Sequence, residues 1–187
     1  MKLRLRILNL VVAAVLALPL CDAAARAAGA EDLDRLFFDL QGADRAEARR
    51  IADDIERIWS RSGSAAMDLL LERGNAALEQ GEITEAIDHL TALTDHAPDF
   101  AEGWNARALA YFHAGRTGPA IADLQRVLAL NPRHFGALAG FGAILETIDR
   151  PAQALEVYRA ALAIHPHLDG IEDAVKRLEA KVAGQEI

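Results

Sequence analysis

Six histidines are the residues of this chain best suited to bind a metal or to transfer a proton near neutral pH. They are His89, His96, His113, His134, His165 and His167. His165 and His167 are close neighbours on either side of a proline, but no third ligand stands at a spacing that would complete a tetrahedral site. We therefore interpret the histidines as surface residues of turns, and we expect neither a metal nor another cofactor.

Adjacent carboxylates are the next candidates for chemistry. Asp53 with Asp54, and Glu172 with Asp173, are neighbours in sequence. Neighbouring residues point to different sides of a helix, so these pairs cannot work as an acid and its partner base. The chain also has no glycine-rich phosphate loop, no HExxH motif and no nucleophile elbow. We expect a binding protein and not an enzyme.

A sequence repeat with a period of 34 residues defines the scaffold that would position any binding site of this chain. The period is clearest in residues 101–134, whose Gly115, Ala120, Leu124, Val127 and Pro132 match Gly81, Ala86, Leu90, Leu93 and Pro98 one period earlier. Ala154, Tyr158, Ala161 and Pro166 take the same places one period later. A fixed period of this length predicts an all-α solenoid of helical hairpins, with repeats at 67–100, 101–134 and 135–167.

The ends of the helices follow from glycine and proline. In the first repeat we expect helices over residues 66–80 and 84–96. Gly81 and Gly115 should end the first helix of their repeats in the left-handed conformation, which Asp149 must adopt in the third repeat at a greater steric cost. A proline closes each repeat, because its ring prevents the second helix from continuing. Small residues mark the positions where helices approach closely: Gly74, Ala108 and Gly142 on the first helices, and Ala86, Ala120 and Ala154 on the second.

Helical segments also flank the repeats. Residues 31–64 show two amphipathic stretches, with Asp44 placed to cap the second one, followed by the linker of residues 60–64. We expect this divergent hairpin to cover the first repeat. Residues 168–183 carry one apolar stripe and one charged face, which predicts a capping helix followed by a tail to residue 187.

The first thirty residues predict a secretory signal. Lys2, Arg4 and Arg6 precede the apolar run Ile7–Leu20, and small residues follow as far as Ala30. The run is too short to span a bilayer, so we expect export without a stable membrane span after the signal is removed. Cys21 leaves an alternative open, in which its lipidation anchors the protein to a membrane. Leu20 departs from the small residue that usually precedes a lipidated cysteine.

The excess of acidic over basic residues in the chain disfavours some classes of partner. Its formal net charge is −8 at pH 7. Nucleic acid and anionic lipid both attract positive protein surfaces, so neither is an expected partner. The same charge also keeps an exported protein soluble, and we give this explanation preference.

The chain resembles the tetratricopeptide repeat family. The resemblance is carried by Trp104, Ala108, Tyr111, Gly115, Ala120, Val127 and Pro132 in the second repeat, and by the corresponding small and closing residues of the other two. Arg107 stands where leucine is usual and Leu124 replaces an aromatic residue. The resemblance implies helix pairs stacked into a right-handed superhelix, with the first helix of each pair lining a concave surface that binds proteins or peptides.

On that resemblance, the groove is lined by residues on one face of each first helix. They are Asp68, Leu71, Asn75 and Leu78, then Glu102, Asn105, Leu109 and Phe112, and then Ala139, Ala143 and Glu146. Asn75 and Asn105 could hydrogen-bond the backbone of a bound segment. The alternative is that Leu71, Leu109 and Phe112 only pack and that the two amides are simply solvated.

The family's clamp for a carboxyl terminus is not expected in this chain. Four of the clamp positions hold Leu71, Ala106, Gly136 and Gly140, and only Asn75 agrees with it. We therefore expect an exported, periplasmic-type adaptor that binds a partner protein or peptide other than a chaperone tail. The alternatives are a self-associating structural array and a lipidated accessory subunit of an envelope assembly machine; the sequence leaves the partner and the oligomeric state open.

Overall fold

The computed structural model describes residues 32–184. The chain divides into two compact units between Asp39 and Leu40, and each is described by itself. In the first unit residues 32–39 are helical, and the helix continues to residue 42 in the second. The expected signal of residues 1–30, Cys21 and residues 185–187 lie outside the described residues.

The second unit consists of helices, and the described part of the chain contains no strand. The helices that follow residue 42 are α2 (Arg45–Trp59), α3 (Ala65–Glu79), α4 (Ile83–His96), α5 (Ala101–His113), α6 (Thr117–Leu130), α7 (Phe135–Thr147), α8 (Pro151–Ile164) and α9 (Ile171–Ala183). The all-α class predicted from the period is confirmed.

The first helices of the hairpins end as the sequence predicts. Gly81 and Gly115 follow α3 and α5 with φ of 76° and 71°, and Asp149 follows α7 with φ of 52°. After α3, the amide of Glu82 donates to the carbonyl of Ala77 at 2.8 Å, so the left-handed residue lets the backbone close over the helix end. The same closure follows α5 and α7. Each hairpin therefore turns at the same point of its repeat.

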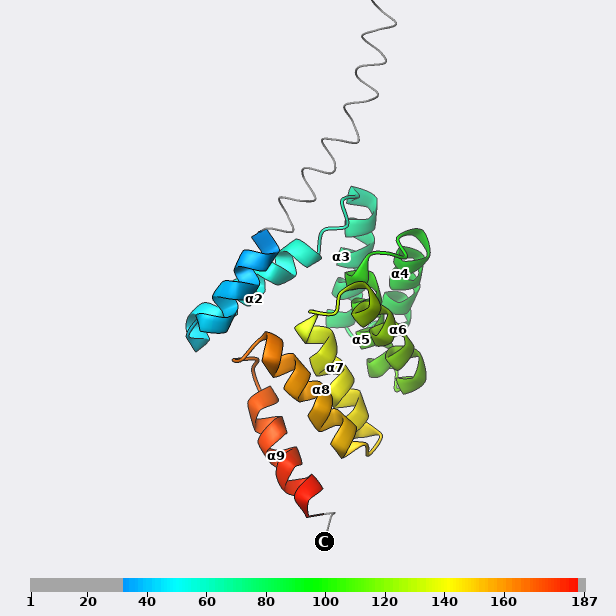
Figure 1. The fold of residues 1–187 in the computed structure, drawn as a ribbon. Coiled ribbons are helices and arrows are strands. Elements are labelled where there is room, and N and C mark those ends of the chain that lie inside the picture. Colours follow the sequence, from blue (N-terminus) through cyan, green and yellow to red (C-terminus); the bar gives the residue numbers. More distant parts are fainter. Residues whose placement is uncertain (1–31, 185–187) are drawn as a thin grey trace, which may run out of the picture. The chain divides into compact units, whose positions relative to one another are not determined.

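The hairpins pack as successive layers around a shared core. α3 packs on α4, α5 on α6 and α7 on α8, and each first helix also contacts the first helix of the next hairpin (Figure 1). Buried side chains fill the space between neighbouring hairpins in three groups, centred on Leu90 and Leu93, on Leu124 and Val127, and on Leu155 and Tyr158. This is the solenoid of stacked helix pairs that the period predicts.

The small residues of the repeat permit close helix contacts. A Cβ atom added to Gly74 would lie 2.5 Å from Cγ of Leu90, and one added to Gly142 would overlap the ring of Tyr158. Ala86, Ala120 and Ala154 are fully buried. Their predicted role as packing positions is confirmed.

The N-terminal capping prediction is also confirmed. The carboxylate of Asp44 accepts hydrogen bonds from the amides of Ala46 and Glu47, both at 2.9 Å. It thereby pairs two backbone N–H groups in the first turn of α2 that have no partner within the helix. The position of α2 differs from the expectation that its hairpin covers the first repeat. The side chains of α2 contact two later turns of the chain. Trp59 stacks on His134, at the end of the second repeat, and Arg45 and Arg49 pair with Asp169, after the third repeat.

Two groups of contacts fix α2 on those turns. At its start Arg45 and Arg49 bind the carboxylate of Asp169, which lies between α8 and α9. At its end Trp59 stacks on His134, the residue before α7, with ring centroids 4.5 Å apart. The helix therefore bridges two turns of the array that are about one repeat apart in sequence.

The last helix covers the end of the array. Ala174 and Leu178 of α9 are buried against α7 and α8. Arg177 of α9 binds the carboxylate of Glu146 on α7, and Lys181 binds Asp149 at 3.0 Å. Asp173 and Lys176 are exposed on the outer side of α9, so the helix closes an apolar end with a polar surface.

Candidate functional site

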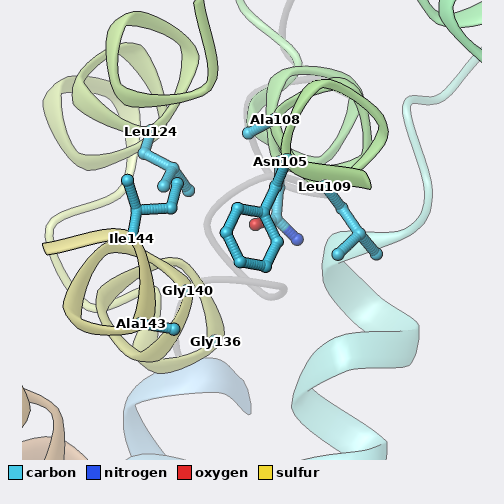
Figure 2. A pocket seen from close by; sticks show the side chains of 9 residues that line it. Asn105, Ala108, Leu109, Leu124, Gly136, Gly140, Ala143 and Ile144 are labelled. Atoms are coloured by element: carbon cyan, nitrogen blue, oxygen red, sulfur yellow. The ribbon is translucent and has the colours of Figure 1, made fainter. Parts of the chain in front are cut away.

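An apolar pocket of about 290 Å³ lies between α5, α6 and α7. Its lining consists of Asn105, Ala108, Leu109 and Phe112 from α5, Leu124 from α6, and Gly136, Gly140, Ala143 and Ile144 from α7. Figure 2 shows Asn105 and Leu109 extending from α5 while Leu124 and Ile144 point toward each other on the opposite side. No lining residue is charged, so the pocket suits one apolar side chain better than a charged group.

The α7 wall of the pocket is open because two of its residues lack side chains. A Cβ atom added to Gly140 would meet no atom within 4 Å, and one added to Gly136 would meet only the ring of His134, at 3.6 Å. The two glycines are one helical turn apart and lie on the same face of α7. Backbone and small side chains therefore form this wall.

Leu109 makes the pocket accessible from solvent. It is 49% exposed, although it lines an apolar site. A bound segment that covers this side chain would remove apolar surface from water. Leu109 is therefore the lining residue that a ligand would contact with the least rearrangement.

A chain of hydrogen bonds leads from the pocket to His134 and the start of α7. Asn105 donates to Oε1 of Glu102 at 3.0 Å, and Oε2 of Glu102 lies 3.0 Å from Nε2 of His134. The amide of Ala137 donates to Nδ1 of His134 at 3.1 Å. Since Nδ1 accepts, the imidazole is neutral and donates through Nε2 to Glu102. The negative charge of Glu102 is thus held by a hydrogen bond from His134, whose ring adds a positive charge only when it is protonated.

These bonds decide the ionisation of Glu102. Burial of its carboxyl group raises the pKa of Glu102, but the hydrogen bond and the charge interaction with His134, and then the hydrogen bond from Asn105, hold the pKa below its ordinary value. Glu102 is therefore ionised at neutral pH. A carboxylate held by hydrogen bonds from His134 and Asn105 therefore remains beside the pocket.

Glu56 of α2 adds a second carboxylate near this charge. Its pKa is raised, first by desolvation and then by the negative charges of Glu102 and Asp53. Glu56 and Trp59 are three residues apart and so share a face of α2, and Trp59 stacks on His134. Glu56 therefore lies on the face of α2 that carries Trp59, close enough to Glu102 for their charges to interact.

The structure brings four of the predicted groove residues together in the pocket: Asn105, Leu109, Phe112 and Ala143. Glu102 lies next to them through its bond to Asn105. Ala139 is half-buried on α7 but is not part of the pocket lining, and Asn75 is exposed on α3. Only some of the residues predicted on the inner face of the first helices therefore line the same pocket.

Other predicted residues have partners within the protein. Asp68 accepts hydrogen bonds from the amide and hydroxyl of Ser62, which ties the linker to α3. Leu71 is only 4% exposed and belongs to the core, and Leu78 packs on that core. Glu146 accepts from Tyr158 and Arg177. Leu71 thus follows the packing alternative, and Asp68 and Glu146 hold structural contacts.

Five lining residues were missing from the prediction: Ala108, Leu124, Gly136, Gly140 and Ile144. Gly136, Gly140 and Ala143 follow helical spacing on one face of α7, and this run of small residues was the available signal. Leu124 lies on α6, the second helix of its hairpin. It could be predicted only by recognising that this helix also reaches the pocket that α5 lines.

The interpretation of the histidines as surface turn residues is wrong for two of them. His134 and His165 are each 3% exposed. His165 lies edge-on to Phe135, with ring centroids 5.2 Å apart, and its burial lowers its pKa. These two imidazoles help to fill the junction of α7 with the turn after α8.

The described residues do not gather a metal site. Among residues 32–184 no group of three or more histidine, cysteine, aspartate or glutamate residues is placed to hold an ion. A second hollow, of about 370 Å³, lies between α3 and α4 and is lined partly by Arg73, Glu85 and His89. Nor is any helix in the described range long and apolar enough to cross a membrane.

Known proteins similar to this chain are repeat proteins. The family model described as tetratricopeptide repeat matches residues 71–121 and 119–169. A TPR repeat-containing protein of Rhizobium etli is 36% identical over 153 residues, which cover 81% of this chain and 75% of that protein. Hsp70-Hsp90 organizing protein 1 of Glycine max is 27% identical over 117 residues, which are 60% of this chain but only 20% of the relative.

Solved structures agree with these sequence matches. The first TPR of Spaghetti (RPAP3), bound to an HSP90 peptide, superposes with a TM-score of 0.60 at 26% identity, covering 63% of this chain and 93% of that one. The Sgt2 TPR domain of Aspergillus fumigatus gives a TM-score of 0.62 at 22% identity, over 66% of this chain and 83% of its own. With two matches of the family model and a relative that shares most of its length, the chain belongs to the tetratricopeptide repeat family.

Proposed function

We propose that this protein is an adaptor that binds a peptide segment of a partner protein, with one apolar side chain of that segment in the α5–α7 pocket. The observation that carries the proposal is the pairing of an uncharged pocket of about 290 Å³ with a half-exposed leucine, Leu109, on its wall. Because the pocket is already open, a partner does not have to displace a side chain of this protein to enter it.

The free energy of binding would come mainly from apolar surface. Leu109 and Phe112 of α5 and Ile144 of α7 offer hydrocarbon on two walls of the pocket. Burial of apolar surface contributes about 25 cal/mol for each Å² removed from water. The Asn105 side chain donates one of its N–H groups to Glu102, and its second N–H and its carbonyl can meet the backbone of a bound segment.

A solved relative supports a peptide ligand. The first TPR of Spaghetti was solved with the HSP90 peptide SRMEEVD bound, and it is 26% identical to this chain. This chain has glycine at two of the positions where the family's clamp would hold polar residues, Gly136 and Gly140. We therefore propose the same class of ligand with a different anchor, an internal apolar side chain in place of a terminal carboxylate.

Leu109→Ser tests the pocket, with Ile148→Ser as its matched control. Both residues are exposed apolar side chains, 49% and 39% exposed, but Ile148 lies at the end of α7 and is not part of the pocket lining. Peptides would be selected from a random twelve-residue display library and measured by fluorescence anisotropy. We expect Leu109→Ser to weaken binding at least about fivefold, and Ile148→Ser to leave it unchanged.

Both variants should unfold at the same urea concentration as the parent protein. Equal weakening by the two substitutions would contradict the pocket as the binding site. Sedimentation at several concentrations provides a second check, because a self-association that depends on Leu109 would favour the structural array over the adaptor.

Export is part of the proposal and rests on the first thirty residues of the sequence. Lys2, Arg4 and Arg6 before the run Ile7–Leu20 are typical of a secretory signal. The full chain should be recovered from the periplasm of an expressing bacterium with a mature N-terminus between residues 26 and 31. Intact Met1 in the recovered protein would overturn export, and a lipid mass on Cys21 would favour the anchored alternative.

A further inference from the structure

The carboxylates of Glu102 and Glu56 lie on the α2 side of the pocket, as described above. Glu102 is bonded to the pocket residue Asn105, and its other partner, His134, is neutral. Glu56 is exposed on α2, and His134 is the basic residue whose charge acts on its carboxylate. The pocket lining supplies no cation. Within residues 32–184, His134 is the basic side chain that acts on these two carboxylates, and neither has a lysine or arginine partner.

The contacts of Trp59 keep these two charges together. Its stack on His134 brings α2 against the residue that donates to Glu102. The negative charge of Glu102 then acts on Glu56 and disfavours its ionisation. Like charges held close together in a folded protein cost free energy, and a ligand that carries the opposite charge removes that cost.

We propose that the groove selects segments in which lysine or arginine stands beside the apolar anchor. The anchor occupies the α5–α7 pocket, and the cation lies between Glu56 and Glu102. This inference rests on the proposed function and specifies its partner: a neutral or basic segment, and not an acidic one. It also makes α2, which lies outside the repeats, a part of the binding site.

The acidic peptide bound to the Spaghetti domain provides the contrast. That peptide, SRMEEVD, carries two adjacent glutamates and a terminal aspartate. In this chain a segment of that charge would bring further carboxylates toward Glu56 and Glu102. The repulsion would oppose binding even where the apolar anchor fits.

The test uses nine-residue peptides that differ only in charge. Each has a central phenylalanine in a glycine and serine background, and the two residues beside it are both lysine, both glutamine or both glutamate. Binding to the protein comprising residues 31–187 is followed by NMR at low salt. We expect the lysine peptide to bind about three- to tenfold more tightly than the glutamate peptide, with the glutamine peptide between them. The difference should shrink at 0.5 M salt.

Two variants of α2 assign the effect to Glu56. Glu56→Gln should remove most of the preference for lysine, and Glu56→Lys should reverse it. Glu47→Gln is the matched control, because Glu47 is also an exposed glutamate of α2 but lies more than two turns from Glu56. It should leave the preference unchanged.

The outcomes separate this inference from the proposed function. If all three peptides bind equally and Leu109→Ser weakens them all, the pocket is the site and the charge selection is wrong. If the glutamate peptide binds most tightly, the inference is overturned. If no peptide binds at millimolar concentration while the protein self-associates, both the inference and the adaptor function are overturned.

Discussion

Trp59 of α2 stacks on His134, the residue that precedes α7, with their ring centroids 4.5 Å apart and their planes inclined by 29°. Phe135 approaches the same indole at 5.2 Å. The two ring systems come from segments that the repeat period does not relate to each other. This stack holds α2 beside Glu102 and so joins a segment outside the repeats to the candidate binding site.

Trp59→Ala should detach the end of α2. The loss of a partly buried indole costs about 2–3 kcal/mol of unfolding free energy, below the range for a fully buried one. Urea unfolding measures this loss, and hydrogen exchange should become faster in residues 45–59. Phe38→Ala is the control, since Phe38 is 80% exposed and its removal should change stability by less than about 0.5 kcal/mol. Equal stability of the two variants would contradict the role of the stack.

Gly140→Ala and Gly142→Ala should have opposite effects although the residues are two apart in α7. A Cβ at Gly140 meets no atom, so alanine should stabilise the helix by about 0.5–1 kcal/mol. A Cβ at Gly142 overlaps the ring of Tyr158, and we expect a loss of about 1–3 kcal/mol. Thermal unfolding of both variants checks the prediction. A gain from both would show that Tyr158 can move aside.

Local residues made the hairpin boundaries predictable, because the end of a helix depends on a few neighbours. Gly81, Gly115 and Asp149 all take positive φ where the period places them. The position of α2 could not be predicted, since it depends on Trp59 meeting His134, which is 75 residues away in sequence. The pocket was predicted only in part: the face of α5 follows from helical spacing, whereas the gap opposite Gly140 depends on how α6 and α7 pack.

Arg107 shows a second feature that the family pattern did not predict. Where leucine is usual, its guanidinium donates to both carboxylate oxygens of Asp123, at 2.7 and 2.9 Å, and to Thr94 at 2.7 Å. The side chains of Arg107 and Asp123 are 12% and 7% exposed. The repeat pattern identified the unusual residue, but only the structure identifies its buried partners.

Arg107→Leu should therefore destabilise the array even though leucine is the usual residue. Asp123 would be left as a buried carboxylate without its cation, which costs about 3 kcal/mol or more. Adding Asp123→Leu should recover much of this loss, because no unpaired charge remains. Chemical unfolding of the single and double variants measures the recovery. Arg126→Leu is the control, since its pair with Asp99 is exposed and contributes less than about 1 kcal/mol.

Glu56→Gln should stabilise the protein at neutral pH. The folded-state pKa of Glu56 is raised above 4.5, so its ionised form is disfavoured in the folded state. The ionisation cost is fully present above the folded-state pKa and disappears as pH falls toward 4.5. The variant should thus exceed the parent by about 0.5 kcal/mol or less at pH 7, because the site is partly exposed to solvent. A lower stability at pH 7 would mean that Glu56 has a stabilising partner in solution.

Glu146→Gln should show the opposite dependence on pH. Its carboxylate accepts from Arg177 at 3.1 Å and from Tyr158 at 3.0 Å, and chiefly the bond from Arg177 lowers its pKa below the ordinary 4.5. A carboxylate with a lowered folded-state pKa stabilises the protein fully above pH 4.5, and this stabilisation is lost as pH falls through the folded-state value. The parent should therefore exceed the variant at pH 7 by about 0.5–1 kcal/mol, a value limited by the exposure of Arg177.

The difference in unfolding free energy between the parent and Glu146→Gln isolates the contribution of Glu146. Other carboxylates titrate in the same pH range, but their contributions are the same in both proteins and cancel. Urea unfolding at pH 7 and at pH 3 should give a difference that is larger at pH 7. The bond to Arg177 joins α7 to α9, so hydrogen exchange in residues 171–183 should accelerate in the variant at pH 7. An unchanged difference across the two pH values would show that the ionised carboxylate does not hold α9 in place.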